Sequence, residues 1–186
     1  MEKAWIFRKA SLDDASFIAK INAMHVGNKG PGGFLIIALD ESEIRHLIES
    51  ADIDFYAAKR SNGELLGYAE ITSQFDRTLL NNMTWVNGIF EQSIKQILSG
   101  DFIYIKQLAI HPSYQRQGVA TFLYKNLEAA IKKDIIVFAA HRPFHNEPSI
   151  AFHKKMGFTM VAKLHRSDFG GHSEYESFFF MKKLSN

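Results

Sequence analysis

The stretch from Phe102 to Phe158 constrains the fold of this 186-residue chain more than any other. It opens with an apolar run, Phe102 to Ile110, which His111-Pro112 ends. The polar run Gln115 to Ala120 then leads directly into apolar residues at helical spacing. This order predicts a strand, a short loop and a helix. The N-terminus of a helix has unpaired backbone N–H groups and the positive end of the helix dipole, so the loop is a candidate phosphate site.

The second half of the same stretch predicts another strand and another helix. Ile135 to Ala140 is apolar throughout, as expected of a strand covered on both faces. Asn146 is followed by Glu147-Pro148-Ser149, which favours a helix start, and Gly157 is placed to end that helix.

These segments resemble the coenzyme-A-binding core of the GNAT superfamily of N-acetyltransferases. The family loop, Q/R-x-x-G-x-G/A after a strand ending in L-x-V-x-P, corresponds to Gln115–Ala120 after Leu108–Pro112. The later family motif, N-x-x-[SA]-x-x-[FL]-Y-x-[KR]-x-G-[FY], corresponds to Asn146–Phe158, with His153 where tyrosine is usual. The two ordered motifs with their strands span about a third of the chain.

The resemblance implies a set of acetyl-CoA-binding residues. The loop residues would hold the pyrophosphate through backbone N–H groups, with Arg116 adding charge; they are Gln115, Arg116, Gln117, Gly118, Val119 and Ala120. The backbone of Leu108, Ala109 and Ile110 would pair with the pantetheine arm where two parallel strands diverge, and an N–H near Leu108 would polarise the thioester carbonyl. Asn146, Ser149 and Phe152 would flank the arm, and Lys154 would approach the nucleotide. The alternatives are an ordinary strand-to-helix turn at Gly118 and a simple helix N-cap at Asn146.

Three residues are candidates for the proton transfers that the resemblance implies. His153 would protonate the leaving thiolate in place of the usual tyrosine, since imidazole can give a proton near neutral pH. The alternative is a histidine that only packs beside coenzyme A. Glu70 would remove the amine's proton, or it is a surface glutamate on a half-exposed strand. Tyr104 on the central strand is a further candidate for proton transfer. Tyr104 or Gln107, both on this strand, could face the acceptor.

The order of elements, with the resemblance, predicts an α/β fold with a mixed, mostly antiparallel central sheet and helices on both faces. We expect one N-acetyltransferase domain over residues 1–186, with a helical insertion around 74–100. Outside the central stretch we expect strands at Trp5–Ala10, Phe55–Lys59, Leu65–Thr72, Thr159–Leu164 and Ser177–Leu184, helices at Ser11–Met24, after Asp40 and within Trp85–Leu98, and loops at Gly27–Gly33 and Ser167–Ser173.

Composition narrows the function classes. The chain is 46% hydrophobic, and its formal net charge is +2. Its basic residues are scattered along the sequence, which disfavours a nucleic-acid partner. It has no cysteine, which excludes disulfides, thiolate metal sites and a cysteine nucleophile and fits a reducing, cytoplasmic location. No apolar run approaches the roughly 20 residues that span a bilayer, so no membrane partner is expected. His141, His145, His165 and His172 show no metal-ligand spacing with carboxylates, so no metal is assigned.

The resulting hypothesis is an acetyl-CoA-dependent N-acetyltransferase, in which a primary amine attacks the thioester directly without a covalent enzyme intermediate. Acetyl-CoA is the co-substrate, and the protein is expected to be a monomer or homodimer. The alternatives are a coenzyme-A-binding regulatory module with little turnover and an O-acetyltransferase. The acceptor should be bounded by Gly27–Gly33, Trp85–Leu98 and Asp168–Glu174, and the sequence does not identify it.

Overall fold

The protein is described by a computed structural model that covers residues 5–27 and 32–184, so residues 28–31 of the loop Gly27–Gly33 lie outside the described residues. The chain forms two compact units. The first comprises the chain up to Thr72 together with Lys106–Lys132, and the second comprises Ser73–Ile105 together with the chain from Lys133 onward. Strand β5 (Phe102–Ile110) matches its predicted bounds and contributes one part to each unit.

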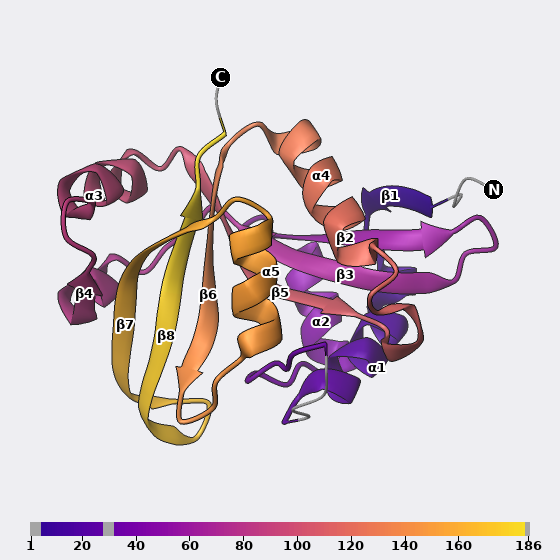
Figure 1. The fold of residues 1–186 in the computed structure, drawn as a ribbon. Coiled ribbons are helices and arrows are strands. Elements are labelled where there is room, and N and C mark those ends of the chain that lie inside the picture. Colours follow the sequence, from indigo (N-terminus) through magenta and orange to yellow (C-terminus); the bar gives the residue numbers. More distant parts are fainter. Residues whose placement is uncertain (1–4, 28–31, 185–186) are drawn as a thin grey trace. The chain divides into compact units, whose positions relative to one another are not determined.

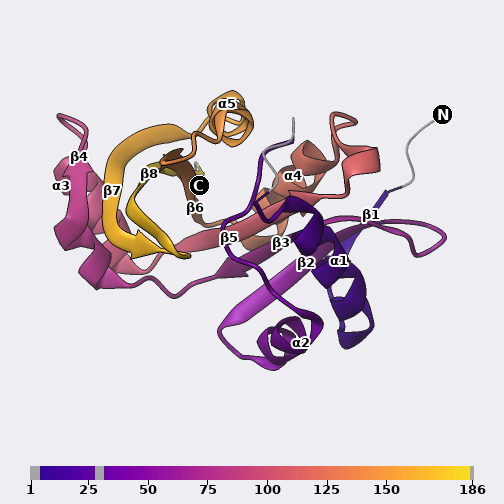
Figure 2. The same ribbon diagram turned by 90° about the horizontal axis from the view of Figure 1, so that it is seen from below.

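The first unit places helices on both faces of antiparallel strands (Figure 2). Its elements are β1 (Trp5–Lys9), the 3-10 helix η1 (Leu12–Asp14), α1 (Ala15–His25), α2 (Glu41–Glu49), β2 (Ile53–Arg60), β3 (Leu65–Thr72), the end of β5, the 3-10 helix η3 (Pro112–Tyr114) and α4 (Val119–Ile131). Successive strand residues point to opposite faces. Ala57 and Ala109 accordingly join the core under α1 and α2, whereas Ala58 and Ile110 pack against α4.

Local signals account for several of these elements. Asp40 and Glu43 form the predicted capping box of α2, because the Glu43 N–H donates to Asp40 Oδ1 at 2.8 Å and the Asp40 N–H donates to Glu43 Oε2 at 2.7 Å. Strand β3 has the predicted bounds and is buried along its whole length. The helix predicted from Ser11 begins instead with the 3-10 turn η1 before α1.

A buried group of polar side chains ties α1 to β3 and β5. Asn22 is fully buried, and its amide donates to Gln107 Oε1 at 2.8 Å and to the Tyr68 hydroxyl at 3.1 Å. The Tyr68 hydroxyl donates to the same Gln107 oxygen at 2.8 Å. Gln107 Nε2 donates to the Ile37 carbonyl at 3.1 Å, and Asn22 Oδ1 accepts from the Leu39 N–H at 2.9 Å. Gln107, a candidate for facing the acceptor, is therefore engaged in holding the segment before α2.

The second unit is built on strands in the order β5-β6-β8-β7-β4 (Figure 1). Its elements are the 3-10 helix η2 (Arg77–Asn82), β4 (Met83–Trp85), α3 (Phe90–Ser99), the start of β5, β6 (Asp134–Arg142), α5 (Glu147–Lys155), β7 (Thr159–Phe169) and β8 (His172–Lys182). β5 pairs with β6 in parallel from Phe102↔Asp134 to Ile105↔Val137, and the other pairs are antiparallel. Phe179 joins an aromatic core that includes Ile97 of α3, while Phe180 stacks with His153 of α5.

Two expectations about the second unit are wrong. Trp85 does not belong to the inserted helix; it lies in β4 opposite Ala162 of β7, and α3 begins only after the turn at Gly88. The spacing of the apolar residues fits a helix, but strand pairing and the contact of Trp85 with Phe179 take precedence. The expected loop Ser167–Ser173 is mostly strand, because β7 and β8 form a long hairpin that turns at Gly170-Gly171. Its alternating polar residues hide the strand pattern in the sequence.

The predicted mixed α/β class with a mostly antiparallel sheet is confirmed. Among the described residues, no helix combines the length and the apolar character that crossing a membrane requires.

We expect Asn22→Leu to lower the free energy of unfolding by roughly 2–4 kcal/mol, because the Leu39 N–H and Gln107 Oε1 each lose a buried partner. Chemical denaturation measures the change. Asn126→Leu is the matched control, since the Asn126 amide donates only one turn back along α4, to the Phe122 carbonyl at 2.8 Å. Equal losses in the two variants would contradict a stabilising role for the buried group.

Candidate functional site

The loop between β5 and α4 reverses the chain through two left-handed residues. After η3, Arg116 has φ 58° and Gly118 has φ 96°, and α4 begins at Val119. A Cβ on Gly118 would meet only the Trp5 ring, at 3.9 Å, so the backbone angle rather than crowding favours glycine here. Arg116 adopts a conformation that is uncommon for a residue with a side chain.

Contacts within the first unit hold the start of this loop. The Tyr114 hydroxyl donates to the Glu64 carboxylate, and the Arg60 guanidinium lies 4.8 Å from the centre of the Tyr114 ring. The His111 N–H donates to the Leu66 carbonyl at 2.8 Å. The turn is therefore attached to the β2–β3 hairpin.

Gln115 packs closely against Gly32, the first described residue after the gap in the loop Gly27–Gly33. A Cβ on Gly32 would lie 2.2 Å from Gln115 Nε2, so glycine is required for the Gln115 amide to occupy this place. The two segments that sequence analysis assigned to pyrophosphate and acceptor thus meet through one side chain.

The start of α4 combines an apolar anchor with an exposed helix end. Val119 and Leu123 are buried against β2 and β3, which fixes the direction of the helix. The Gly118 carbonyl accepts from the Phe122 N–H at 2.9 Å, the first bond of the helix. The N–H groups of the first turn have no acceptor within the helix, and the dipole of the 13-residue helix is positive at this end. This arrangement suits an anion. Arg116 supplies a cation from the neighbouring loop.

The end of β5 is anchored on both faces. Ala109 and Ile110 are buried in the two cores of the first unit, and Leu108 is partly buried. The buried His25 lies with Nε2 at 2.7 Å from the Ile110 carbonyl, which makes His25 the donor through Nε2. The carbonyl of Ile110 is therefore already paired within the protein.

Glu70 is a buried carboxylate next to a cation. Its side chain is 1% exposed, and Oε1 lies 2.7 Å from Nζ of Lys106 on β5. Burial raises the pKa of Glu70 above its ordinary value, and the charge and hydrogen bond of Lys106 oppose that shift. The alternative of a half-exposed surface glutamate does not describe this residue.

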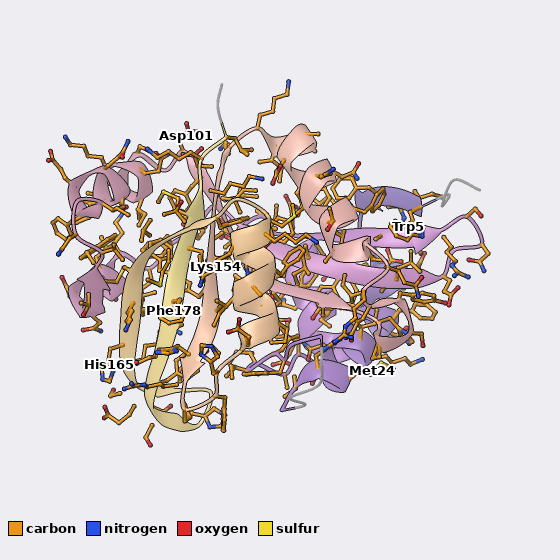
Figure 3. All side chains as sticks on the ribbon, in the orientation of Figure 1. Trp5, Met24, Asp101, Lys154, His165 and Phe178 are labelled. Atoms are coloured by element: carbon orange, nitrogen blue, oxygen red, sulfur yellow. The ribbon has the colours of Figure 1, made fainter. Side chains whose placement is uncertain are left out.

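Asn146 caps the start of helix α5, as its sequence predicts. Asn146 Oδ1 accepts from the Ser149 N–H at 3.4 Å, and the Asn146 N–H donates to the Ala140 carbonyl of β6 at 3.0 Å. At the other end, Gly157 has φ 85° and the Phe158 N–H donates to the His153 carbonyl at 3.0 Å, which confirms the predicted helix end. Lys154 is exposed on this helix (Figure 3).

His153 is buried on α5 and packs against aromatic rings. Nδ1 lies 2.7 Å from the Ser149 carbonyl, so Nδ1 carries a proton and donates it. The ring stacks with Phe180 at 6.0 Å and meets the edges of Phe152 and Phe158. Burial lowers the pKa of His153 to about 4, because the charged imidazolium would lose its hydration; the Ser149 carbonyl opposes the shift. The ring is neutral near pH 7, which disfavours the imidazolium role expected for it.

Tyr104 lies in the aromatic core of the second unit. Its ring meets the Phe138 ring edge-on at 5.6 Å, and it is partly buried. The structure therefore assigns Glu70 to the core of the first unit, and Tyr104 and His153 to that of the second.

Sequence analysis missed a group of side chains in the second unit. His141, His145 and Glu147 are joined by contacts of 3.0 and 2.8 Å where β6 leads to α5. The spacing H-x-x-x-H-x-E from His141 to Glu147, which includes Asn146, was the available signal. Within the residues that the structure describes, no group of three or more potential ligands is arranged to hold a metal ion.

We expect the His153 ring to stay neutral down to about pH 4, as NMR titration of its ring nitrogens would show. Because the folded-state pKa lies below the ordinary value of 6.5, the folded state resists protonation. Stability is therefore full above pH 6.5 and falls between pH 6.5 and about 4. His153→Leu should lack this part of the pH dependence in denaturation curves, and a midpoint near 6.5 would contradict the burial argument.

Comparison with known proteins agrees with these motifs. The family model for the acetyltransferase (GNAT) family matches residues 29–158. The structure of Arabidopsis thaliana NAA60 in complex with acetyl-CoA is similar with a TM-score of 0.66 and 18% identity, covering 96% of this chain and 97% of that chain. The structure of YncA, a putative acetyltransferase from Salmonella typhimurium with acetyl-CoA, is similar with a TM-score of 0.62 and 18% identity, covering 98% of this chain and 95% of that chain. A mutant of the Vibrio cholerae spermidine N-acetyltransferase SpeG is similar with a TM-score of 0.62 and 14% identity, covering 96% of this chain and 93% of that chain.

No curated protein matches the sequence. The structural matches share the fold at low identity, whereas the family model spans more than half of the chain, from the segment before α2 to the end of the second motif. On that basis the chain belongs to the acetyltransferase (GNAT) family.

Proposed function

We propose that this protein is an acetyl-CoA-dependent N-acetyltransferase that transfers an acetyl group to a primary amine by direct attack. The observation that carries the proposal is the loop Gln115–Ala120, which reverses through Arg116 and Gly118 and opens the N-terminus of α4. A loop of this form suits a pyrophosphate, and membership of the family supports acetyl-CoA as its source.

The residues proposed to hold acetyl-CoA keep the roles that the family implies. Backbone N–H groups from Gln115 to Ala120 would bind the pyrophosphate, with Arg116 as the cation. The backbone of Leu108, Ala109 and Ile110 would meet the pantetheine arm, and the Leu108 N–H would polarise the carbonyl. Since Ile110 already accepts from His25, its carbonyl is the least suited of the three to this pairing. Asn146, Ser149, Phe152 and Lys154 would contact the same molecule from α5.

Acetyl-CoA would supply an activated thioester whose C–S bond breaks as the amine nitrogen forms the amide bond. An ammonium acceptor loses two protons in all: one goes to a base before the attack, and the other leaves as the amide forms and is taken by the thiolate. Glu70 stays a proposed base, supported by its raised pKa; the ion pair with Lys106 keeps it ionised but opposes the rise in pKa and so weakens it as a base. The neutral state of His153 favours Tyr104 or water over His153 as the donor to the thiolate.

The titles of the structural matches indicate the range of amines to test. They include a spermidine N-acetyltransferase, a putative phosphinothricin N-acetyltransferase and NAA60 in complex with a bisubstrate analogue. We propose a primary amine without choosing among these. The cysteine-free composition supports a cytoplasmic location, and the single domain and the monomeric or homodimeric state stay predictions.

One observation favours a second candidate, a coenzyme-A-binding module with little turnover. The family motif usually has tyrosine where this chain has His153, and this histidine is buried and neutral. Such a module would bind acetyl-CoA without releasing thiol when amines are added.

We expect acetyl-CoA to raise the melting temperature and Gly118→Glu to abolish that shift, because a carboxylate at the loop would repel the pyrophosphate. Gly100→Glu is the matched control. Gly100 also has positive φ, 72°, with nothing near its Cβ position, so it shares the backbone strain but lies at the end of α3, away from the loop in the chain. Differential scanning fluorimetry and calorimetry measure both variants. Normal binding by Gly118→Glu would mean that the loop is only a turn.

Turnover separates the two candidates. We expect thiol release from acetyl-CoA to depend on added amine in at least one of three assays, with spermidine, with phosphinothricin or with a peptide that has a free N-terminus. Mass spectrometry should find the acetyl group on nitrogen. Binding of acetyl-CoA without amine-dependent thiol release would favour the module, and an acetyl ester product would favour O-acetylation.

A further inference from the structure

Helix α3 in the second unit presents a row of apolar side chains to solvent. Phe90, Ile94 and Leu98 follow one another at intervals of four residues, so they are neighbours on one face of the helix. Phe90 is 49% exposed and Leu98 is 44% exposed, and Ile94 between them is half-buried. We call these three residues the α3 row. Such a contiguous apolar surface is typical of a contact with another protein.

The α3 row is separate from the side chains that attach the helix to its own unit. Ser93 and Ile97 are buried, and Ile97 belongs to the aromatic core. The Phe90 ring meets the Trp85 ring of β4 edge-on, with centroids 5.1 Å apart, which fixes the start of the row. β4 is the last strand at this edge of the sheet, and α3 follows it at the same end of the unit (Figure 1). The row is therefore held on a fixed helix and open to a partner.

One flank of the α3 row carries two opposite charges. Lys95 Nζ lies 2.6 Å from Glu91 Oε1, four residues away on the same helix. Both side chains are largely exposed, at 80% for Glu91 and 73% for Lys95. With a turn of about 100° per residue, they lie about 60° and about 100° around the helix axis from Ile94, on the same side. The solvent face of α3 is thus an apolar row next to one acid and one base.

This face is complementary to a second copy of itself in one orientation. If two α3 helices pack antiparallel about a twofold axis level with Ile94, then Phe90 of each helix meets Leu98 of the other. The axis leaves both charged flanks on the same side of the contact. Glu91 of one helix is then offset from Lys95 of the other by two residues, or about 3 Å along the axis, which is within reach of an ion pair. Parallel packing would put the charged flanks on opposite sides.

We propose that the α3 row is the contact of a symmetric homodimer, in which two α3 helices pack antiparallel and Glu91 of each copy pairs with Lys95 of the other. The argument for a second copy, rather than an unrelated protein, is this charge complementarity, because the same acid and base serve both sides. One helix face is smaller than the roughly 800 Å² that each partner buries in a stable complex. The dimer is therefore weak and dissociates on dilution. The proposal does not depend on the acetyltransferase function.

Sedimentation velocity between about 1 μM and about 1 mM protein tests the dimer. We expect wild type to associate as its concentration rises and Ile94→Lys to stay monomeric, because two ammonium groups would meet at the twofold axis. Phe17→Lys is the matched control, since Phe17 is also an exposed apolar residue, 52% exposed, within a helix, but in α1 of the first unit. It should associate as wild type does. Circular dichroism and the melting temperature check that each variant is folded.

Charge exchange tests the antiparallel arrangement. Glu91→Lys and Lys95→Glu each make the flank of α3 uniformly basic or uniformly acidic, and we expect each to self-associate about tenfold more weakly than wild type. An equimolar mixture of the two variants should recover association, because a basic flank then faces an acidic one. Both variants lose the ion pair within the helix, so a change in helix stability cannot explain recovery in the mixture.

Three outcomes would overturn the proposal. A wild type that stays monomeric up to about 1 mM would leave the α3 row to a different protein. Association that survives in a folded Ile94→Lys variant would place the contact elsewhere on the molecule. A mixture that associates no better than its two components would contradict the pairing of Glu91 with Lys95. If Ile94→Lys does not fold, the mixture decides alone.

Discussion

The backbone reversal at Arg116 and Gly118 is the constraint on which the candidate phosphate site depends. Two left-handed residues within three positions turn the short connection 115–118 between the 3-10 turn η3 and α4. Burial of Val119 and Leu123 fixes the helix, and the contact between Tyr114 and Glu64 fixes the approach of the chain. The first-turn N–H groups are thereby held in place before any ligand arrives. Such preorganisation lowers the cost of binding an anion.

Burial, more than residue type, separates the titratable candidates. His153 matches the position of a family acid, but its burial among Phe152, Phe158 and Phe180 holds it neutral. Glu70 is equally buried, yet Lys106 offsets part of the cost of its charge. His141 stacks on one ring and stays partly exposed, so its proton can exchange with a ligand or with water. Histidine is thus a buried packing residue in one place and a partly exposed group in another.

Features with a local cause could be predicted from the sequence. The bounds of β5 and β3, the capping box at Asp40 and the helix start at Asn146 follow from runs of apolar residues and from caps, and each is confirmed. Features that depend on a distant partner were not accessible. Trp85 lies in a strand only because β7 pairs with it, and the outer β7–β8 hairpin is polar enough to resemble a loop.

The candidate site divides in the same way. The conformation of the loop Gln115–Ala120 depends on its own glycine, Gly118, and on the helix that follows it. The burial of His153 depends on Phe180, which is 27 positions further along the chain, and that of Glu70 on strands packed around it. The hydrogen-bonded chain of His141, His145 and Glu147 is local in sequence, but it depends on how β6 leads into α5.

The energetics of the two proton transfers explain why a base should matter more than an acid in this protein. A thiol with a pKa of about 8.5 is a fair leaving group, and protonating its anion at pH 7 is worth only about 2 kcal/mol. An alkylammonium with a pKa near 10.4 must lose its proton before attack, which costs about 4–5 kcal/mol at the same pH. A chain that lacks the family tyrosine therefore gives up the smaller contribution. The larger cost falls on the ammonium, and Glu70 is the residue proposed to take its proton.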